Sequence, residues 1–223
     1  MIRNVKSEEN SLIIRNYESK KSTENRQILA PTFFRVFIKN PFVEVFQAEM
    51  AFSSAYDAKP ILASYGAGPC IIMAGYNSKF KAGFIAHFSC YQEVICSYRK
   101  ITQIIKKYFG TGNTNISLFL SGGIKGCVTS ENIFRTIKSL YSLCVEPNLS
   151  FSFKSNNPLH SETEDSKSLA LDTRSGEIST YDPLQDNPVS FRKLTHEDVL
   201  WAQQSFEQAP ALKIIYPPTN IET

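Results

Sequence analysis

The stretch Ile61-Leu-Ala-Ser-Tyr-Gly-Ala-Gly-Pro-Cys-Ile-Ile-Met-Ala-Gly75 predicts two buried β-strands joined by a tight turn. The runs on either side of the turn are almost entirely apolar, which is typical of strands that are covered on both faces. Gly66 and Gly68 supply the turn, because glycine adopts backbone conformations that other residues avoid. We therefore expect a sheet-rich core around this stretch.

Outward from this stretch, further short apolar runs predict more strands, at 43–46, 50–52, 82–88, 116–120 and 149–153, and a hairpin at 168–172 and 177–181. A helical apolar spacing predicts a long helix over 91–108, ended by Gly110. We expect a second helix that Ser130 caps. Because strands and helices follow one another in irregular order, the sequence favours an α+β fold, a layered β-sandwich flanked by helices.

The amino-acid composition indicates a protein with a sizeable core and free thiols, and it argues against a nucleic-acid-binding protein. The chain has 223 residues, of which 42 % are hydrophobic, enough for a sizeable core. Its net charge of +3 results from 24 basic and 21 acidic residues, a balance that argues against nucleic acid as a partner. The odd number of five cysteines favours free thiols in a reducing compartment.

Targeting and metal signals are weak. The sequence has no CxxC pair, and its three histidines are far apart in the chain, so no metal site is expected. The first residues lack the apolar stretch of a signal peptide, and no apolar run approaches the ~18 residues of a membrane span. We expect a cytoplasmic protein without membrane insertion.

The chain divides into three expected parts. Residues 1–42 form a polar N-terminal extension that we expect to be partly disordered. Residues 43–182 form the core. Residues 183–223 form a C-terminal extension, in which one helix, running from Thr195 to about Gln208, docks on the core.

The candidate catalytic residues are Cys70, His87 and Ser64. A thiol at a glycine-rich strand end and an imidazole seventeen residues later fit a nucleophile and its base. A nearby imidazolium lowers the pKa of a cysteine, and a hydroxyl orients the ring as the third member of a triad does. The structural alternative is that Cys70 is a small buried hydrophobe, His87 is a core histidine, and the glycines only make a turn.

A wider set of motifs favours the catalytic reading. They are Val45-Phe-Gln-Ala-Glu-Met-Ala-Phe, then Ser64-Tyr-Gly-Ala-Gly-Pro-Cys70, then Gly83-Phe-Ile-Ala-His87. Phe119-Leu-Ser-Gly-Gly, Ser130-Glu-Asn-Ile and the hairpin that begins at Ser168 follow in order. Together these segments, over about residues 43–182, resemble the CheD family of chemoreceptor glutamine deamidases.

The resemblance implies a CheD-like sandwich related to the cytotoxic necrotizing factor type of Cys–His deamidases. It implies that Cys70 and His87 convert an exposed glutamine of a protein substrate to glutamate with release of ammonia, without cofactor or metal. It also implies a CheC-type phosphatase as a partner. Two alternatives stay open: an exported effector that deamidates a host protein, and a catalytically idle adaptor.

Two positions depart from the family pattern. Ser64 replaces a threonine and keeps the hydroxyl. Pro69 stands where the family has serine and lacks a backbone N–H, so the donors to an oxyanion must differ if that group contributes. The backbone N–H of Cys70 is the candidate donor.

Overall fold

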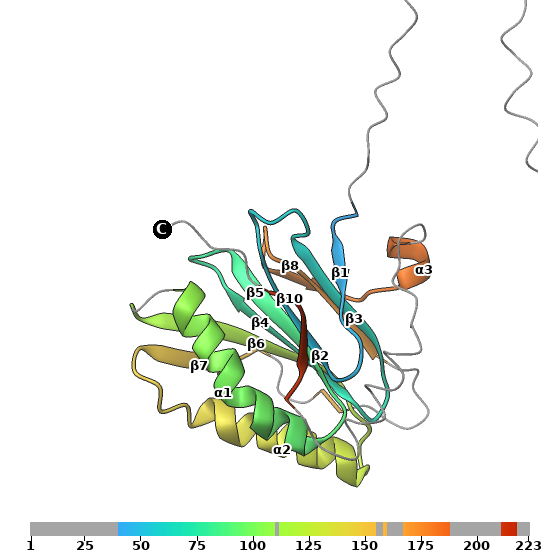
Figure 1. Cartoon of the computed structure of the whole chain (residues 1–223). Coiled ribbons are helices and arrows are strands. Elements are labelled where there is room, and N and C mark those ends of the chain that lie inside the picture. The colour runs from blue at the N-terminus through green and yellow to red at the C-terminus, as the bar shows by residue number, and fades with distance from the viewer. Residues whose placement is uncertain (1–39, 110–111, 155–157, 160–166, 188–210, 218–223) are drawn as a thin grey trace, which may run out of the picture. The chain divides into compact units, whose positions relative to one another are not determined.

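The computed structural model describes residues 40–109, 112–154, 158–159, 167–187 and 211–217 (Figure 1). These residues belong to one compact unit, Ile38–Thr223. The predicted N-terminal extension, apart from residues 40–42, and the predicted helix at 195–208 lie outside the described residues. The division of the chain into three parts therefore stays a prediction.

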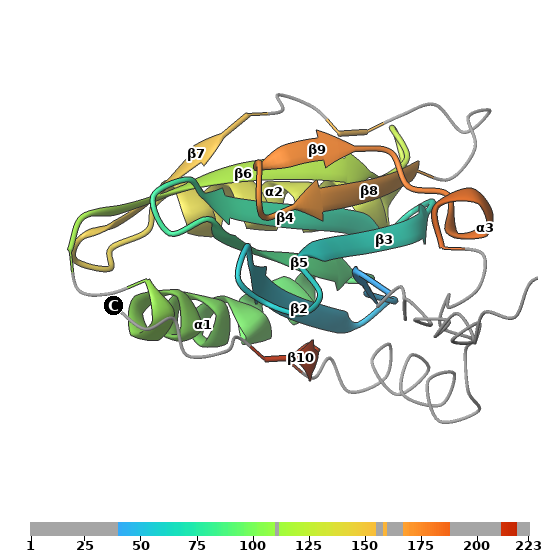
Figure 2. The same cartoon turned by 90° about the horizontal axis from the view of Figure 1, so that it is seen from above.

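The strands of the described residues form two sheets (Figure 2). The smaller sheet has the order β1 (Phe42–Glu44), β3 (Ile61–Ala67), β8 (Lys167–Asp172) and β9 (Glu177–Ser179). The larger sheet has the order β10 (Lys213–Tyr216), β2 (Glu49–Ser54), β5 (Ala82–Phe88), β4 (Ile71–Asn77), β6 (Thr114–Gly122) and β7 (Leu149–Phe153).

Two long helices, α1 (Tyr91–Tyr108) and α2 (Val128–Ser142), cover one face of the larger sheet (Figures 1 and 2). A short helix, α3 (Pro183–Asp186), follows the smaller sheet. The predicted bounds of the first helix agree with α1, since its apolar residues repeat along a single face that packs on the sheet. The predicted α+β layered sandwich is confirmed.

The layer between the two sheets is a second apolar core. Leu62 of β3 and Leu171 of β8 face Ile72 of β4 and Ile85 of β5, and all four are fully buried. Because side chains alternate along a strand, neighbouring residues such as Phe84 and Phe88 face the helices instead. The larger sheet is thus covered on both faces, as its apolar sequence predicts.

The strand directions place both long helices at the same end of the larger sheet. β5 and β6 each pair antiparallel with β4 and so run in the same direction. Since α1 follows β5 and α2 follows β6, both helices begin near the end where β4 begins. This arrangement brings the N-termini of α1 and α2 to the turn that precedes β4.

The start of α2 differs from the expectation. The N-cap residue is Cys127, and Ser130 is the third residue inside the helix. The Ser130 hydroxyl donates a hydrogen bond to the carbonyl of Pro69 instead of capping the helix. A helix-start signal in the sequence is often displaced by a few residues when a side chain has a tertiary partner.

Gly83 permits the close approach of the two sheets, and its substitution tests this packing. A Cβ on Gly83 would lie 2.5 Å from the carbonyl oxygen of Gly75 and 2.7 Å from Cδ2 of Leu171. We expect Gly83→Ala to lower the free energy of unfolding by about 1–3 kcal/mol, because the backbone oxygen has no free space to move into. Urea unfolding measures the change.

Gly112→Ala is the matched control, because no heavy atom lies within 4 Å of a Cβ built on Gly112. It should change the free energy of unfolding by less than about 0.5 kcal/mol. Equal stability of the Gly83 variant and the control would contradict the packing argument.

Candidate active site

The three predicted residues belong to three neighbouring segments of the sandwich. Ser64 lies in β3, His87 lies in β5, and Cys70 immediately precedes β4. His87 pairs across the sheet with Ile72, two residues after Cys70. Cys70 and Ile72 both belong to the apolar core between the sheets. The backbone therefore directs all three predicted side chains toward the layer between the two sheets.

The structure joins Ser64 and His87 directly. The Ser64 hydroxyl donates to the carbonyl oxygen of Val45 at 2.6 Å, and its oxygen lies 2.9 Å from Nδ1 of His87. A hydroxyl has one proton, and Val45 receives it, so Ser64 can only accept from His87. We assign the proton of the neutral imidazole to Nδ1, which leaves Nε2 with a free lone pair.

The second ring nitrogen has no partner. Nε2 of His87 is buried and forms no hydrogen bond with any described residue, Cys70 included. A buried nitrogen without a partner is uncommon, because it gives up its contact with water without compensation. The lone pair on Nε2 is therefore available as a base within the core. Close contact between Nε2 and the Cys70 sulfur stays a prediction.

Both reacting groups are neutral in this structure. Burial lowers the pKa of His87 to about 4. Burial, followed by the negative charge of Glu93, raises the pKa of the Cys70 thiol to about 12. At neutral pH the site holds a thiol and an imidazole, not the thiolate–imidazolium pair expected from the sequence. If Cys70 is a nucleophile, its proton must pass to Nε2 as the sulfur attacks.

Access to solvent is graded across the site. Cys70 is 8 % exposed, His87 is 3 % exposed, and Ser64 is fully buried. The Cys70 thiol therefore lies nearer the surface than His87 and Ser64. This order suits a nucleophile that meets a substrate from outside the sandwich.

Glu93 is a charged residue of the site that the sequence analysis missed. It is fully buried at the start of α1. Its carboxylate accepts from the Ser89 backbone N–H at 2.7 Å and from the Ser89 hydroxyl at 2.8 Å. Burial raises the pKa of Glu93, while the bonds from Ser89 oppose the shift. The spacing Cys90-Tyr-Gln-Glu93 is that of a capping box, a signal hidden by cysteine at the cap position.

The turn before Cys70 is held by the segment between β6 and α2. The N–H of Gly123 donates to the carbonyl of Gly68 at 2.9 Å. The Ser130 hydroxyl donates to the carbonyl of Pro69 at 2.8 Å and accepts from the N–H of Ile124 at 2.9 Å. Two successive carbonyls of the turn are thus fixed by direct hydrogen bonds.

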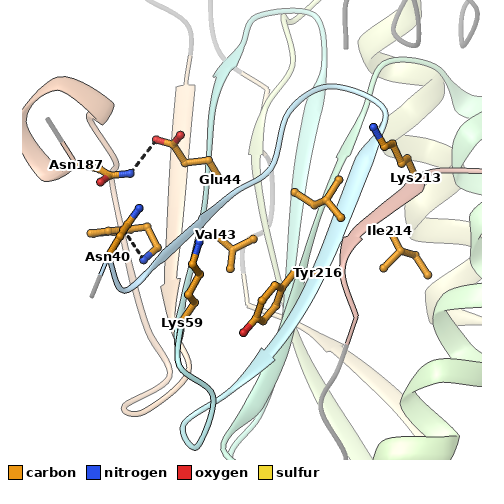
Figure 3. A pocket seen from close by; sticks show the side chains of 10 residues that line it. Asn40, Val43, Glu44, Lys59, Asn187, Lys213, Ile214 and Tyr216 are labelled. Atoms are coloured by element: carbon orange, nitrogen blue, oxygen red, sulfur yellow. Dashed lines mark hydrogen bonds between the residues drawn. The ribbon is translucent and has the colours of Figure 1, made fainter. Parts of the chain in front are cut away.

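A pocket lies elsewhere, along β1 and β10 (Figure 3). It has a volume of about 460 Å³, and Glu44, Lys59, Asn187, Lys213 and Tyr216 are among its lining residues. None of the three predicted catalytic residues lines it.

Within the described ranges, no group of three or more His, Cys, Asp or Glu side chains could hold a metal ion. No helix there is both long and apolar enough to cross a membrane. No protein-family model and no curated protein sequence matches the chain.

The tautomer of His87 can be tested by NMR. Long-range ¹H–¹⁵N spectra should show one imidazole with its proton on Nδ1 that stays neutral well below pH 6.5, because burial lowers its pKa to about 4. His87→Gln identifies the signal by its loss. A His87 ring that titrates near its ordinary value would contradict the assignment.

The lowered pKa of His87 also makes the stability of the folded protein depend on pH. Below pH 6.5 the unfolded chain binds a proton at His87 that the folded chain does not bind until the pH reaches about 4. The stability of the wild-type protein should therefore fall relative to His87→Gln as the pH is lowered through this window. Melting temperatures of the two proteins measure the difference.

Proposed function

We propose that the chain is a cysteine-dependent protein-glutamine deamidase of the CheD type, which converts a glutamine side chain of a protein to glutamate and ammonia. The observation that carries the proposal is the state of His87. Its Nδ1 is engaged by a buried hydroxyl, and its buried Nε2 has a free lone pair on the face that it shares with Cys70. Most buried histidines have both ring nitrogens paired, so an unpaired Nε2 on the same face as a cysteine favours a chemical role for His87.

The reaction uses these groups in sequence. Nε2 of His87 takes the proton of the Cys70 thiol while the sulfur bonds to the carboxamide carbon and the carbonyl oxygen becomes an oxyanion. The imidazolium then protonates the nitrogen, ammonia leaves, and a thioester remains. Water gives a proton to Nε2 and its oxygen to the thioester carbon, which releases glutamate and restores the thiol.

The low pKa of His87 favours the second step, in which ammonia leaves. An imidazole with a pKa of about 4 is a weak base, but its conjugate acid is strong. The imidazolium formed during attack therefore gives its proton readily to the poor leaving group of an amide. Ser64 stabilises this imidazolium, because its oxygen accepts from Nδ1.

The motif resemblance favours chemoreceptor cytoplasmic domains as the first substrates to test, and a CheC-type phosphatase as the first partner. Specificity for the substrate and the partner would come from surface loops around the site. A deamidase of another protein, such as a host target of an exported effector, would use the same three residues.

Ammonia release tests the proposal. The full chain is incubated with chemoreceptor domains, unfolded casein and a glutamine dipeptide, and mass spectrometry locates each conversion of glutamine to glutamate. Cys70→Ala should abolish the reaction, because it removes the nucleophile. Cys96→Ala, at an exposed cysteine of α1, is the control that should keep full activity.

Ammonia release by Cys70→Ala at the wild-type rate would exclude Cys70 as the nucleophile. If the wild-type chain binds the phosphatase or a chemoreceptor but modifies no glutamine in any of these substrates, the idle adaptor replaces the deamidase.

Ser64 variants test the orienting hydroxyl. Ser64→Ala should lower kcat by about 10- to 100-fold, comparable with the loss of a hydrogen-bond partner behind a catalytic or ligating histidine. Ser64→Thr should keep activity because it retains the hydroxyl, whereas Ser64→Val has nearly the same shape and no hydroxyl. NMR should show that only the variants without a hydroxyl lose the fixed Nδ1–H tautomer. Equal activity of the Thr and Val variants would reduce Ser64 to a packing residue.

A further inference from the structure

Ser130 contacts the turn at the residue directly before Cys70. It is fully buried in the first turn of α2, and its hydroxyl oxygen takes part in two hydrogen bonds. It donates to the carbonyl of Pro69 at 2.8 Å and accepts from the N–H of Ile124 at 2.9 Å. Neither partner belongs to the helix, so the hydroxyl does not serve the helix itself.

We propose that Ser130 is a positioning residue, which aims the backbone N–H of Cys70 at the oxyanion of the reaction. The proposal rests on the deamidase function proposed above. In a planar trans peptide the carbonyl oxygen of one residue and the N–H of the next point in opposite directions. When Ser130 fixes the Pro69 carbonyl, it therefore also fixes the direction of the Cys70 N–H.

The ring of Pro69 also helps to fix the direction of the Cys70 N–H. It restricts the φ angle of residue 69, while the bond from Ser130 restricts the rotation of the peptide group that follows. Gly122 packs closely against the next peptide group, since a Cβ on Gly122 would lie 2.6 Å from the carbonyl oxygen of Cys70. Ser130 thus holds the peptide group before the Cys70 α-carbon, and Gly122 packs against the peptide group after it.

The donor itself is available. Among the backbone hydrogen bonds that join described residues outside the regular helices and strands, none is donated by the Cys70 N–H. A fixed donor without an acceptor suits a charge that appears only during the reaction. As the sulfur–carbon bond forms, the electron pair of the carbonyl double bond moves to oxygen, and this oxygen accepts from the Cys70 N–H.

Two reagents distinguish an effect of Ser130 on the orientation of the Cys70 N–H from a general effect on the fold. Both are applied to the full chain. p-Nitrophenyl acetate acylates a thiol through a tetrahedral oxyanion and releases p-nitrophenolate. Iodoacetamide alkylates the same sulfur by direct displacement of iodide, with no oxyanion. Peptide mass spectrometry measures the adduct on Cys70 for each reagent, apart from the other four cysteines.

Ser130→Ala should slow the acylation of Cys70 by about 10- to 100-fold, because the oxyanion donor is no longer held in place. It should change alkylation by less than about twofold, since the thiol and its base are unchanged. Ser130→Thr should restore acylation. Thr136→Ala, which removes a hydroxyl that bonds within α2 itself, is the matched control and should affect neither rate.

Equal losses in acylation and alkylation would overturn the proposal, because they would show that Ser130 only holds the turn together. Unchanged rates of both would also overturn it. If Ser130→Ala does not fold, Ser130→Cys keeps the side-chain size with a weaker donor and serves for the same comparison. If the wild-type chain deamidates nothing while acylation still depends on Ser130, the proposed function fails and the positioning role stands.

Discussion

The candidate site depends on the hydrogen bonds of the Ser64 hydroxyl. It lies between the two sheets, donates its single proton to the Val45 carbonyl and accepts from His87. Because Ser64 belongs to the smaller sheet and His87 to the larger one, this bond exists only when the sheets are packed together. Burial excludes water, which could otherwise replace either partner. The tautomer of the base is thus a product of the tertiary fold, and the site cannot form on either sheet alone.

Burial between the two sheets also explains why His87 and Cys70 are both neutral. The layer that holds the imidazole is apolar, so burial disfavours the charged form of His87 and of Cys70 alike. The N-termini of α1 and α2, which begin at the same end of the sheet, oppose the effect of burial on Cys70 but not on His87, because they favour negative and disfavour positive charge nearby. Glu93 counters the first of these helices with its own charge. The balance leaves a neutral resting pair beside groups that favour negative charge on sulfur or on a substrate oxygen.

The sequence predicts those features that repeat locally. The apolar alternation of 82–88 and the helical spacing of 91–108 correspond to β5 and α1, because each pattern is set by one face of one element. Cys70 and His87 could be proposed from their positions at strand ends, and Ser64 from its hydroxyl near the glycine-rich turn. The roles of Glu93 and Ser130 could not, since each depends on a partner whose place is set by the order of strands in the sheet. Ser130 resembles a helix cap in sequence, and only the packing of α2 against the turn reveals its bond to Pro69.

The backbone at the end of β6 and just after it is shaped by its close contact with the turn that holds Cys70. Gly122 and Gly123 have φ angles of 95° and 82°, which residues with a side chain rarely adopt. A Cβ at Gly122 would lie 2.6 Å from both the Cys70 carbonyl oxygen and the Cβ of Ala67. Only glycine lets this segment approach closely enough for Gly123 and Ser130 to reach the carbonyls of Gly68 and Pro69. The Ser121-Gly-Gly motif is therefore best understood as part of the support of Cys70, since it fixes the turn that holds the proposed nucleophile and its N–H.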